Sequence, residues 1–195
     1  MAELILLGGG GHCESVIEVI QGLSEFNIKG ILDPAYDINV PRNVLGFPIL
    51  GNDDQIEEFI NKGYQFVITV GQIHSSILRE KLYDKVVSKG GKLPVIVANT
   101  SHVSKRTNVA EGTVIHHNVL INTKVNLGKC CIVNSGSIIE HGCIIDGFCH
   151  ISTGAILNGE VNCGKGVFIG SGTVINQRTK IGNNLVIASG SLVRK

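Results

Sequence analysis

The second half of the chain repeats a six-residue pattern of hydrophobic and polar positions. From Val103 onward, every sixth position carries an aliphatic residue or, once, a cysteine. These positions are Val103, Val109, Ile115, Ile121, Leu127, Val133, Ile139, Ile145, Ile151, Leu157, Cys163, Ile169, Ile175, Ile181, Ile187 and Val193. A small or apolar residue follows four positions after each as far as Ile187, and most of the turn positions between are polar or glycine. The period predicts short strands and turns that wind into a parallel β-helix around an aliphatic column.

The first half alternates apolar runs with stretches of helical periodicity. Leu4 to Leu7 form a continuous apolar run, which predicts a strand buried on both faces. Further strands are expected at 28–33, 66–71 and 94–97, and helices at 16–23, 56–60 and 77–87. Asp53 or Asp54 is expected to cap the second helix, and Ile77, Leu78, Leu82, Val86 and Val87 to form the apolar face of the third. Alternating strands and helices predict an α/β domain with a parallel sheet over residues 1–96, followed by an all-β domain over 97–195.

Composition narrows the class of protein. The 195 residues include 25 glycines but only 4 prolines, and 17% are charged, which excludes a disordered chain and a collagen. A net charge of +1 makes nucleic acid a poor candidate partner. No apolar run is long enough to span a bilayer, and the N-terminus lacks the features of a signal peptide. We therefore expect a cytoplasmic protein.

The cysteines fall on the repeat in a way that favours a packing role. Cys131, Cys143 and Cys149 occupy the small inward position, and Cys163 occupies the aliphatic one. Metal-binding and disulfide frameworks usually show C-x-x-C pairs, which this chain lacks. We expect reduced thiols that pack as small hydrophobic side chains.

A glycine-rich loop joins the first strand to the first helix. Gly8, Gly9, Gly10 and Gly11 precede His12, at the position where open α/β sheets bind ligands and helix N-termini attract phosphate. The spacing does not fit G-x-G-x-x-G, which argues against NAD or FAD. Asp33 ends the second strand, where an acid meets ribose hydroxyls in related folds. Cys13 follows the loop, where a helix N-terminus can lower a thiol pKa, but we favour packing for it.

These segments together resemble a known family, the bacterial sugar acetyltransferases with a Rossmann-like N-terminal domain and a left-handed hexapeptide-repeat β-helix. The family includes sialic acid O-acetyltransferases and UDP-4-amino-sugar N-acetyltransferases. The segments that carry the resemblance are residues 8–12, 32–33, 48–51, 134–141, 150–155 and 158–159. The resemblance also implies coils of three hexapeptides and left-handed winding.

The resemblance implies acetyl transfer from acetyl-CoA to a sugar hydroxyl or amine in surface-glycan synthesis. His141 matches the general base, His150 a second active-site histidine, and Asn134 a residue that lines the site. Glu140 comes directly before His141. The amino-sugar N-acetyltransferases are expected to carry an acid directly after the base, and this chain has Gly142 at that position. No metal is expected.

Two binding sites follow from the same resemblance. Gly159 matches a glycine whose N–H faces the acetyl carbonyl, and Ser152 and Ser171 are placed with it in the cofactor site. The loop from Gly8 to His12 and Asp33 match a pocket for the sugar or nucleotide-sugar.

Spacing on the repeat predicts an oligomer. His141 and His150 are nine residues apart, half of an 18-residue coil, so one chain places them on roughly opposite sides of its prism. If both serve one reaction centre, neighbouring subunits must supply them, which predicts a homotrimer with three shared sites. His116 and His117 lie in one turn and are expected to be solvated.

Two other functions stay open at this point. A zinc carbonic anhydrase-like protein of the same repeat class would bring together His117, His141 and His150 across subunits. A non-catalytic sugar-nucleotide sensor is suggested because the sequence stops at Lys195, without the Gly-x-Pro-Ala-like tail that helps to cover CoA in the family. The acceptor sugar, and O- against N-acetylation, are not decided by the sequence.

Overall fold

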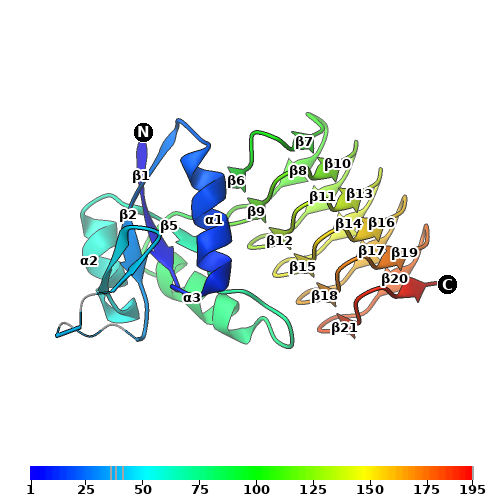
Figure 1. Cartoon of the computed structure of the whole chain (residues 1–195). Coiled ribbons are helices and arrows are strands. Elements are labelled where there is room, and N and C mark those ends of the chain that lie inside the picture. Colours follow the sequence, from blue (N-terminus) through cyan, green and yellow to red (C-terminus); the bar gives the residue numbers. More distant parts are fainter. Residues whose placement is uncertain (36, 38, 41, 195) are drawn as a thin grey trace. The chain divides into compact units, whose positions relative to one another are not determined.

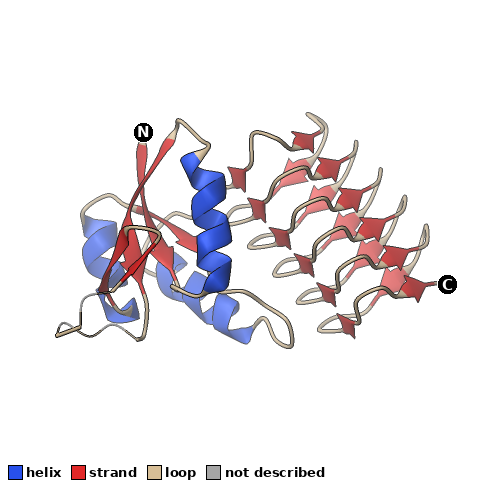
Figure 2. Ribbon diagram, viewed as in Figure 1, coloured by secondary structure: helices blue, strands red, loops and turns tan. Residues whose placement is uncertain are grey.

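The computed structural model describes residues 1–35, 37, 39–40 and 42–194. It forms two compact units, drawn in Figures 1 and 2. The first unit comprises Met1–Gly71 and Ile77–Pro94, and the second comprises Gln72–Ser76 and Val95–Lys195. The segment Gln72–Ser76 thus belongs to the second unit, although the residues before and after it in the sequence belong to the first. The predicted boundary after residue 96 stays a prediction.

The first unit is an α/β fold with a five-stranded sheet in the order β3-β4-β2-β1-β5. All pairs are parallel except that of β3 with β4. The strands are β1 (Ala2–Leu7), β2 (Phe26–Leu32), β3 (Asn43–Val44), β4 (Phe47–Gly51) and β5 (Gln65–Ile68). The helices are α1 (Gly11–Gln21), the 3-10 helix η1 (Asp53–Gln55), α2 (Ile56–Asn61) and α3 (Ile77–Val87). The α/β fold predicted from the sequence is confirmed.

Two details of the predicted helices are wrong. The N-cap residue of α2 is Gln55, and the side-chain cap lies one element earlier, where Asn52 Oδ1 at the start of η1 accepts a hydrogen bond from the Asp54 N–H at 2.9 Å. Helix α3 is rotated relative to the expected apolar face, because Leu78 is exposed and Arg79 is buried. The Arg79 guanidinium donates to the carbonyls of Ile68 and Val70 at the end of β5, and these hydrogen bonds allow a cation to be buried there.

The second unit is a parallel β-helix of two-residue strands. The strands form three parallel sheets, one on each side of the β-helix, and we call them the first, second and third faces. The first face holds β7 (His102–Val103), β10 (Leu120–Ile121), β13 (Ile138–Ile139), β16 (Ile156–Leu157), β19 (Val174–Ile175) and β22 (Leu192–Val193). The second face holds β8 (Asn108–Val109), β11 (Asn126–Leu127), β14 (Ile144–Ile145), β17 (Asn162–Cys163) and β20 (Lys180–Ile181). The third face holds β6 (Ile96–Val97), β9 (Val114–Ile115), β12 (Ile132–Val133), β15 (His150–Ile151), β18 (Phe168–Ile169) and β21 (Val186–Ile187).

The register of these strands confirms an 18-residue coil. Ile121 pairs with Ile139, and Ile139 pairs with Leu157, each one coil further along the chain. Figure 1 shows the strands stacked coil upon coil, from green at β7 to red near the C-terminus. The second residue of each strand points inward, and the first points outward. Figure 2 shows that strands and turns alone build this unit.

The interior of the β-helix is the predicted aliphatic column. Its buried core runs from Ile115 to Ile181 and includes Cys131, Cys143 and Cys149. All six cysteines are free and buried. The packing role predicted for them is confirmed.

Two of the three edges of the prism carry site residues predicted from the sequence. The His141 corner denotes the turns between the first and second faces, residues 104–107, 122–125, 140–143, 158–161 and 176–179. The Asn134 corner denotes the turns between the third and first faces, residues 98–101, 116–119, 134–137, 152–155, 170–173 and 188–191. At the Asn134 corner, Gly136, Gly154 and Gly172 have φ of +70°, +66° and +65°. This left-handed conformation favours glycine and explains much of the glycine content of the repeat.

Candidate active site

A pocket of about 370 Å³ opens at the carboxyl ends of β1 and β2 in the first unit. Its lining comprises Gly8, Gly9, Gly10, Gly11, His12, Asp33, Pro34, Asp53, Thr69, Val70, Gly71, Leu78 and Leu82. The structure therefore brings together every residue that the sequence assigns to the substrate pocket.

Asp33 shapes the glycine loop directly. One carboxylate oxygen accepts from the Gly9 N–H at 2.6 Å, and the other accepts from the Ala35 N–H at 2.8 Å. Gly8 has a φ of +103°, and a Cβ there would lie 2.6 Å from a methyl group of Val70. The loop thus needs glycine to follow this path, and Asp33 holds it at the end of β2.

Asp53 is a pocket residue that sequence reasoning took only for a helix cap. Burial raises the pKa of its carboxyl group, partly offset by Lys85. Cys13 lies just beyond the loop, and burial raises the pKa of its thiol to about 11. A reactive thiolate is therefore not expected here, and the packing role is supported.

His141 is exposed in the second unit, and it lies against Gly159 one coil further on. A Cβ at Gly159 would come within 2.7 Å of both Cε1 and Nε2 of the His141 ring. Glu140 points elsewhere, because its Oε2 accepts from Asn122 Nδ2 at 2.9 Å. Glu140 and His141 share no hydrogen bond in the described part of the chain.

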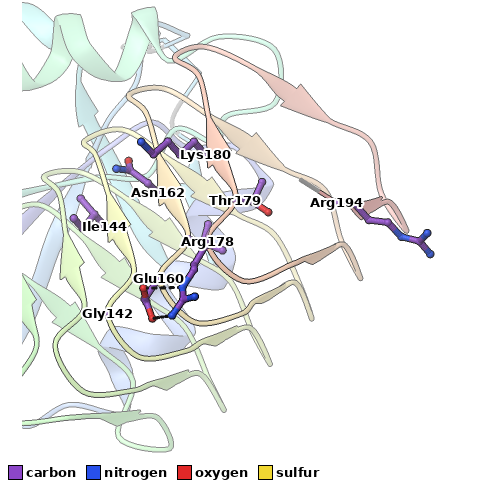
Figure 3. Close-up of a pocket in the computed structure, with 9 residues that line it drawn as sticks. Gly142, Ile144, Glu160, Asn162, Arg178, Thr179, Lys180 and Arg194 are labelled. Atoms are coloured by element: carbon purple, nitrogen blue, oxygen red, sulfur yellow. Dashed lines mark hydrogen bonds and ion pairs between the residues drawn. The ribbon is translucent and has the colours of Figure 1, made fainter.

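A groove of about 720 Å³ runs beside the His141 corner and is drawn in Figure 3. Its lining comprises Gly142, Ile144, Glu160, Val161, Asn162, Arg178, Thr179, Lys180 and Arg194. Glu160 and Arg178 lie one coil apart and form a two-pronged ion pair, with N–O distances of 3.1 and 3.2 Å. Sequence reasoning missed this pair, although opposite charges 18 residues apart are a readable signal in such a repeat.

His150 lies away from this groove, on the third face. It is 8% exposed, and its Nδ1 lies 2.6 Å from the backbone oxygen of Gln72. Its Nε2 lies 3.4 Å from Asn134 Nδ2 at the Asn134 corner. Ser152 and Ser171 meet at the same corner, with 2.8 Å between their hydroxyl oxygens.

One chain therefore carries two separate groups of predicted site residues. His141, Glu140 and Gly159 belong to the His141 corner, whereas Asn134, Ser152 and Ser171 belong to the Asn134 corner, next to His150.

The prediction that His116 is solvated is wrong. His116 is 2% exposed, and burial lowers its pKa to about 4, with smaller effects from His117 and His150. His117 is half-buried, and its Nδ1 lies 2.9 Å from Thr100 Oγ1.

The residues that the structure describes contain no group of three or more histidine, cysteine or acidic side chains arranged to hold a metal ion. None of their helices is long and apolar enough to cross a membrane.

Comparison with known protein families gives two matches. A model of the PglD N-terminal domain matches residues 3–86. A model of the bacterial transferase hexapeptide (six repeats) matches residues 160–195.

Solved structures match along nearly the whole chain. A histidine-to-asparagine variant of perosamine N-acetyltransferase from Caulobacter crescentus, in complex with CoA and GDP-perosamine, has a TM-score of 0.92 at 26% identity, covering 100% of this chain and 90% of that one. The acetyltransferase domain of PglB from Neisseria gonorrhoeae FA1090, in complex with acetyl coenzyme A, has a TM-score of 0.91 at 26% identity, covering 98% and 90%. PerB from Caulobacter crescentus, in complex with CoA and GDP-perosamine, has a TM-score of 0.89 at 27% identity, covering 100% and 90%. The predicted α/β domain followed by a left-handed β-helix is confirmed.

Proposed function

The chain belongs to the bacterial sugar acetyltransferases that join a Rossmann-like N-terminal domain to a left-handed hexapeptide β-helix, and we propose that this acyltransferase moves an acetyl group from acetyl-CoA to the amine of a nucleotide-linked amino sugar. The observation that carries the proposal is the similarity, over both units at once, to an N-acetyltransferase crystallised with CoA and GDP-perosamine. The free, buried thiols agree with a cytoplasmic setting.

The glycine-loop pocket is proposed to bind the nucleotide-linked sugar. Backbone N–H groups at the start of α1 favour negative charge, which suits a diphosphate. Asp33 already accepts two backbone hydrogen bonds, and its remaining lone pairs are suited to ribose or base donors. Asp53 adds a second acceptor on the same wall.

His141 is proposed as the general base. It would take a proton from the attacking amine as the C–N bond forms and the C–S bond of the thioester breaks, and then return that proton to the CoA thiolate. The Gly159 N–H is proposed to donate to the developing oxyanion of the acetyl carbonyl. The contact between Gly159 and the His141 ring supports this pairing, because both groups then face one reacting centre.

Three copies of the chain are proposed to build three shared sites. The first face lies between the His141 corner and the Asn134 corner, and after His102 of β7 its outward column is aliphatic from β10 to β22. The column comprises Leu120, Ile138, Ile156, Val174 and Leu192. Leu120 and Leu192 are 36% and 53% exposed, so the single chain leaves apolar surface uncovered there. Packing this face around a three-fold axis would set the His141 corner of one chain beside the Asn134 corner of the next.

A panel of acceptors tests the function. Purified protein and acetyl-CoA are mixed with GDP- and UDP-linked amino sugars, CMP-sialic acid and free sialic acid, and release of CoA thiol is followed. Turnover with a nucleotide-linked amino sugar is expected. Turnover only with sialic acid would overturn the N-acetyl assignment, and tight binding without thiol release would favour a sensor.

The base is tested by His141→Gln. A loss of kcat of roughly 10²- to 10⁴-fold is expected, because general-base catalysis contributes that much. His74→Gln serves as the control, since His74 is exposed and has no role in the proposed reaction. Equal activity of the two variants would overturn the role of His141.

A further inference from the structure

His150 occupies a position that calls for an explanation. It is the outward residue of β15, with Ile132 before it and Phe168 after it in the same column of the third face. The Phe168 ring meets it edge-on, with 5.1 Å between ring centroids. A buried imidazole among apolar neighbours needs partners for both ring nitrogens.

The segment Gln72–Ser76 supplies one of these partners and is anchored on the same coils. Gln72 is 3% exposed, and its side-chain Nε2 donates to the Phe148 carbonyl at 2.8 Å and more weakly to the Gly166 carbonyl at 3.4 Å. At the other end of the segment, a Cβ on Gly166 would lie 2.9 Å from Ser76 Oγ. The side chain of Gln72 therefore holds its own backbone in a fixed place on the β-helix.

That backbone determines which nitrogen of His150 carries the proton. A carbonyl oxygen only accepts, so Nδ1 must donate to Gln72 O across 2.6 Å. Asn134 Nδ2 only donates, so Nε2 must accept from it. The orientation of the Asn134 amide is supported separately, because its Oδ1 accepts from the Ser135 N–H at 3.3 Å.

We infer that Gln72 is a positioning residue that holds His150 in the Nδ1-protonated tautomer and so presents Nε2 as an acceptor at the Asn134 corner. A substrate N–H or O–H at this corner would then replace the long 3.4 Å contact from Asn134 Nδ2 at the single lone pair of Nε2, and Nε2 would not donate a hydrogen bond to the acetyl carbonyl. The effect on catalysis rests on the proposed function, whereas the tautomer does not.

Gln72→Met tests the inference, because methionine has similar length and no donor. The Oε1 of Gln72 has no hydrogen-bond partner within the described residues, so the loss of that atom leaves no group unpaired. Imidazole ¹⁵N NMR on histidine-labelled protein is the direct readout, with the His150 signal assigned from the His150→Asn spectrum. The wild type is expected to show Nδ1–H, and Gln72→Met a mixture of tautomers.

Kinetics supply the second readout. A fall in kcat of about 10-fold is expected for Gln72→Met, with KM for acetyl-CoA changed less than about 2-fold, since a positioning residue acts on the reacting geometry. In the His150→Asn background, Gln72→Met is expected to have no further effect on kcat. Gln21→Met, at the exposed end of α1, is the control.

Each outcome has a definite meaning. An Nε2–H tautomer in the wild type, an unchanged His150 signal in Gln72→Met, or a full additional loss in the His150→Asn background would overturn the role of Gln72. Circular dichroism identifies a variant that has merely unfolded. If no acceptor is acetylated by the wild type, the proposed function fails, and the NMR result still decides the tautomer.

Discussion

At the scale of single residues, the site depends on a glycine as much as on a histidine. Gly159 leaves room for the His141 ring, which a methyl group would meet at 2.7 Å. This is closer than carbon atoms normally approach, so the ring must move when the glycine is replaced.

Gly159→Ala is therefore expected to lower kcat by about 10- to 100-fold, as a displacement of about 1 Å can do. Circular dichroism should show a folded protein. Gly182→Ala is the matched control, because a Cβ there meets only Leu185 at an ordinary 3.7 Å. Full activity of Gly159→Ala would refute the proposed contact of His141 with the reacting centre.

The buried His116 makes a prediction about acid stability. The unfolded chain protonates this histidine below about pH 6.5, whereas burial holds the folded pKa at about 4. The folded state therefore binds fewer protons in this window, and the free energy of unfolding falls as the pH drops from 6.5 to 4. Once the pH is below 4 and His116 is protonated in both the folded and the unfolded state, the free energy of unfolding has fallen by roughly 3 kcal/mol.

Urea denaturation at a series of pH values measures this loss. His116→Gln is expected to flatten the dependence between pH 6.5 and 4, whereas His102→Gln, which replaces an exposed histidine, leaves it as in the wild type. The same slope in all three proteins would show that other groups cause the acid sensitivity.

Where a pattern fixes a position, the sequence is enough to say where a residue lies in the fold. Asp33 and the glycine loop follow from strand and helix order, and they meet in one pocket. Gln72 was missed because it lies outside the repeat and becomes important only through a contact with His150, 78 residues away. Asp53 was missed because its burial depends on the tertiary fold.

At the scale of elements, the β-helix was the more predictable unit. Each coil repeats the same information, so an error at one position, such as Cys163, does not disturb the phase. The sequence predicts fewer elements of the α/β unit, because β3 and β4 are short and Pro48 within β4 argues against a strand. The helical period also predicted the wrong buried face for α3, because Arg79 is buried there and donates hydrogen bonds to two backbone carbonyls.

The six thiols lie buried in the two units, so we expect them to be protected from thiol reagents. All six are buried, and burial raises the pKa of Cys13 and Cys143 to about 11. A thiol reagent such as Ellman's reagent is expected to modify none of them within minutes in native protein, and all six after denaturation. Ser189→Cys adds an exposed thiol that should react at once. Rapid reaction of the wild type would contradict the described core.

At the scale of the whole molecule, the first face predicts the oligomer. Light scattering coupled to size exclusion is expected to give about three times the 20.8 kDa of one chain. Ile156→Asp places a charge in the aliphatic column and should yield monomers without activity, because each shared site loses half of its residues. Asn108→Asp, on the second face, is the control. An active monomer would refute the shared site.

The strict register of the coils limits how such a protein can change in length. Each strand pairs with the one 18 residues away, without interruption from β6 to β22. Loss of six residues would preserve the alternation of inward and outward side chains, yet it would rotate every later corner by one face of the prism. His150 would leave its column while the core stayed filled. Gain or loss of whole coils outside residues 134–171 would therefore keep the proposed site residues of the β-helix in register with one another, whereas loss of a single hexapeptide between them would leave a filled core with those residues on different edges.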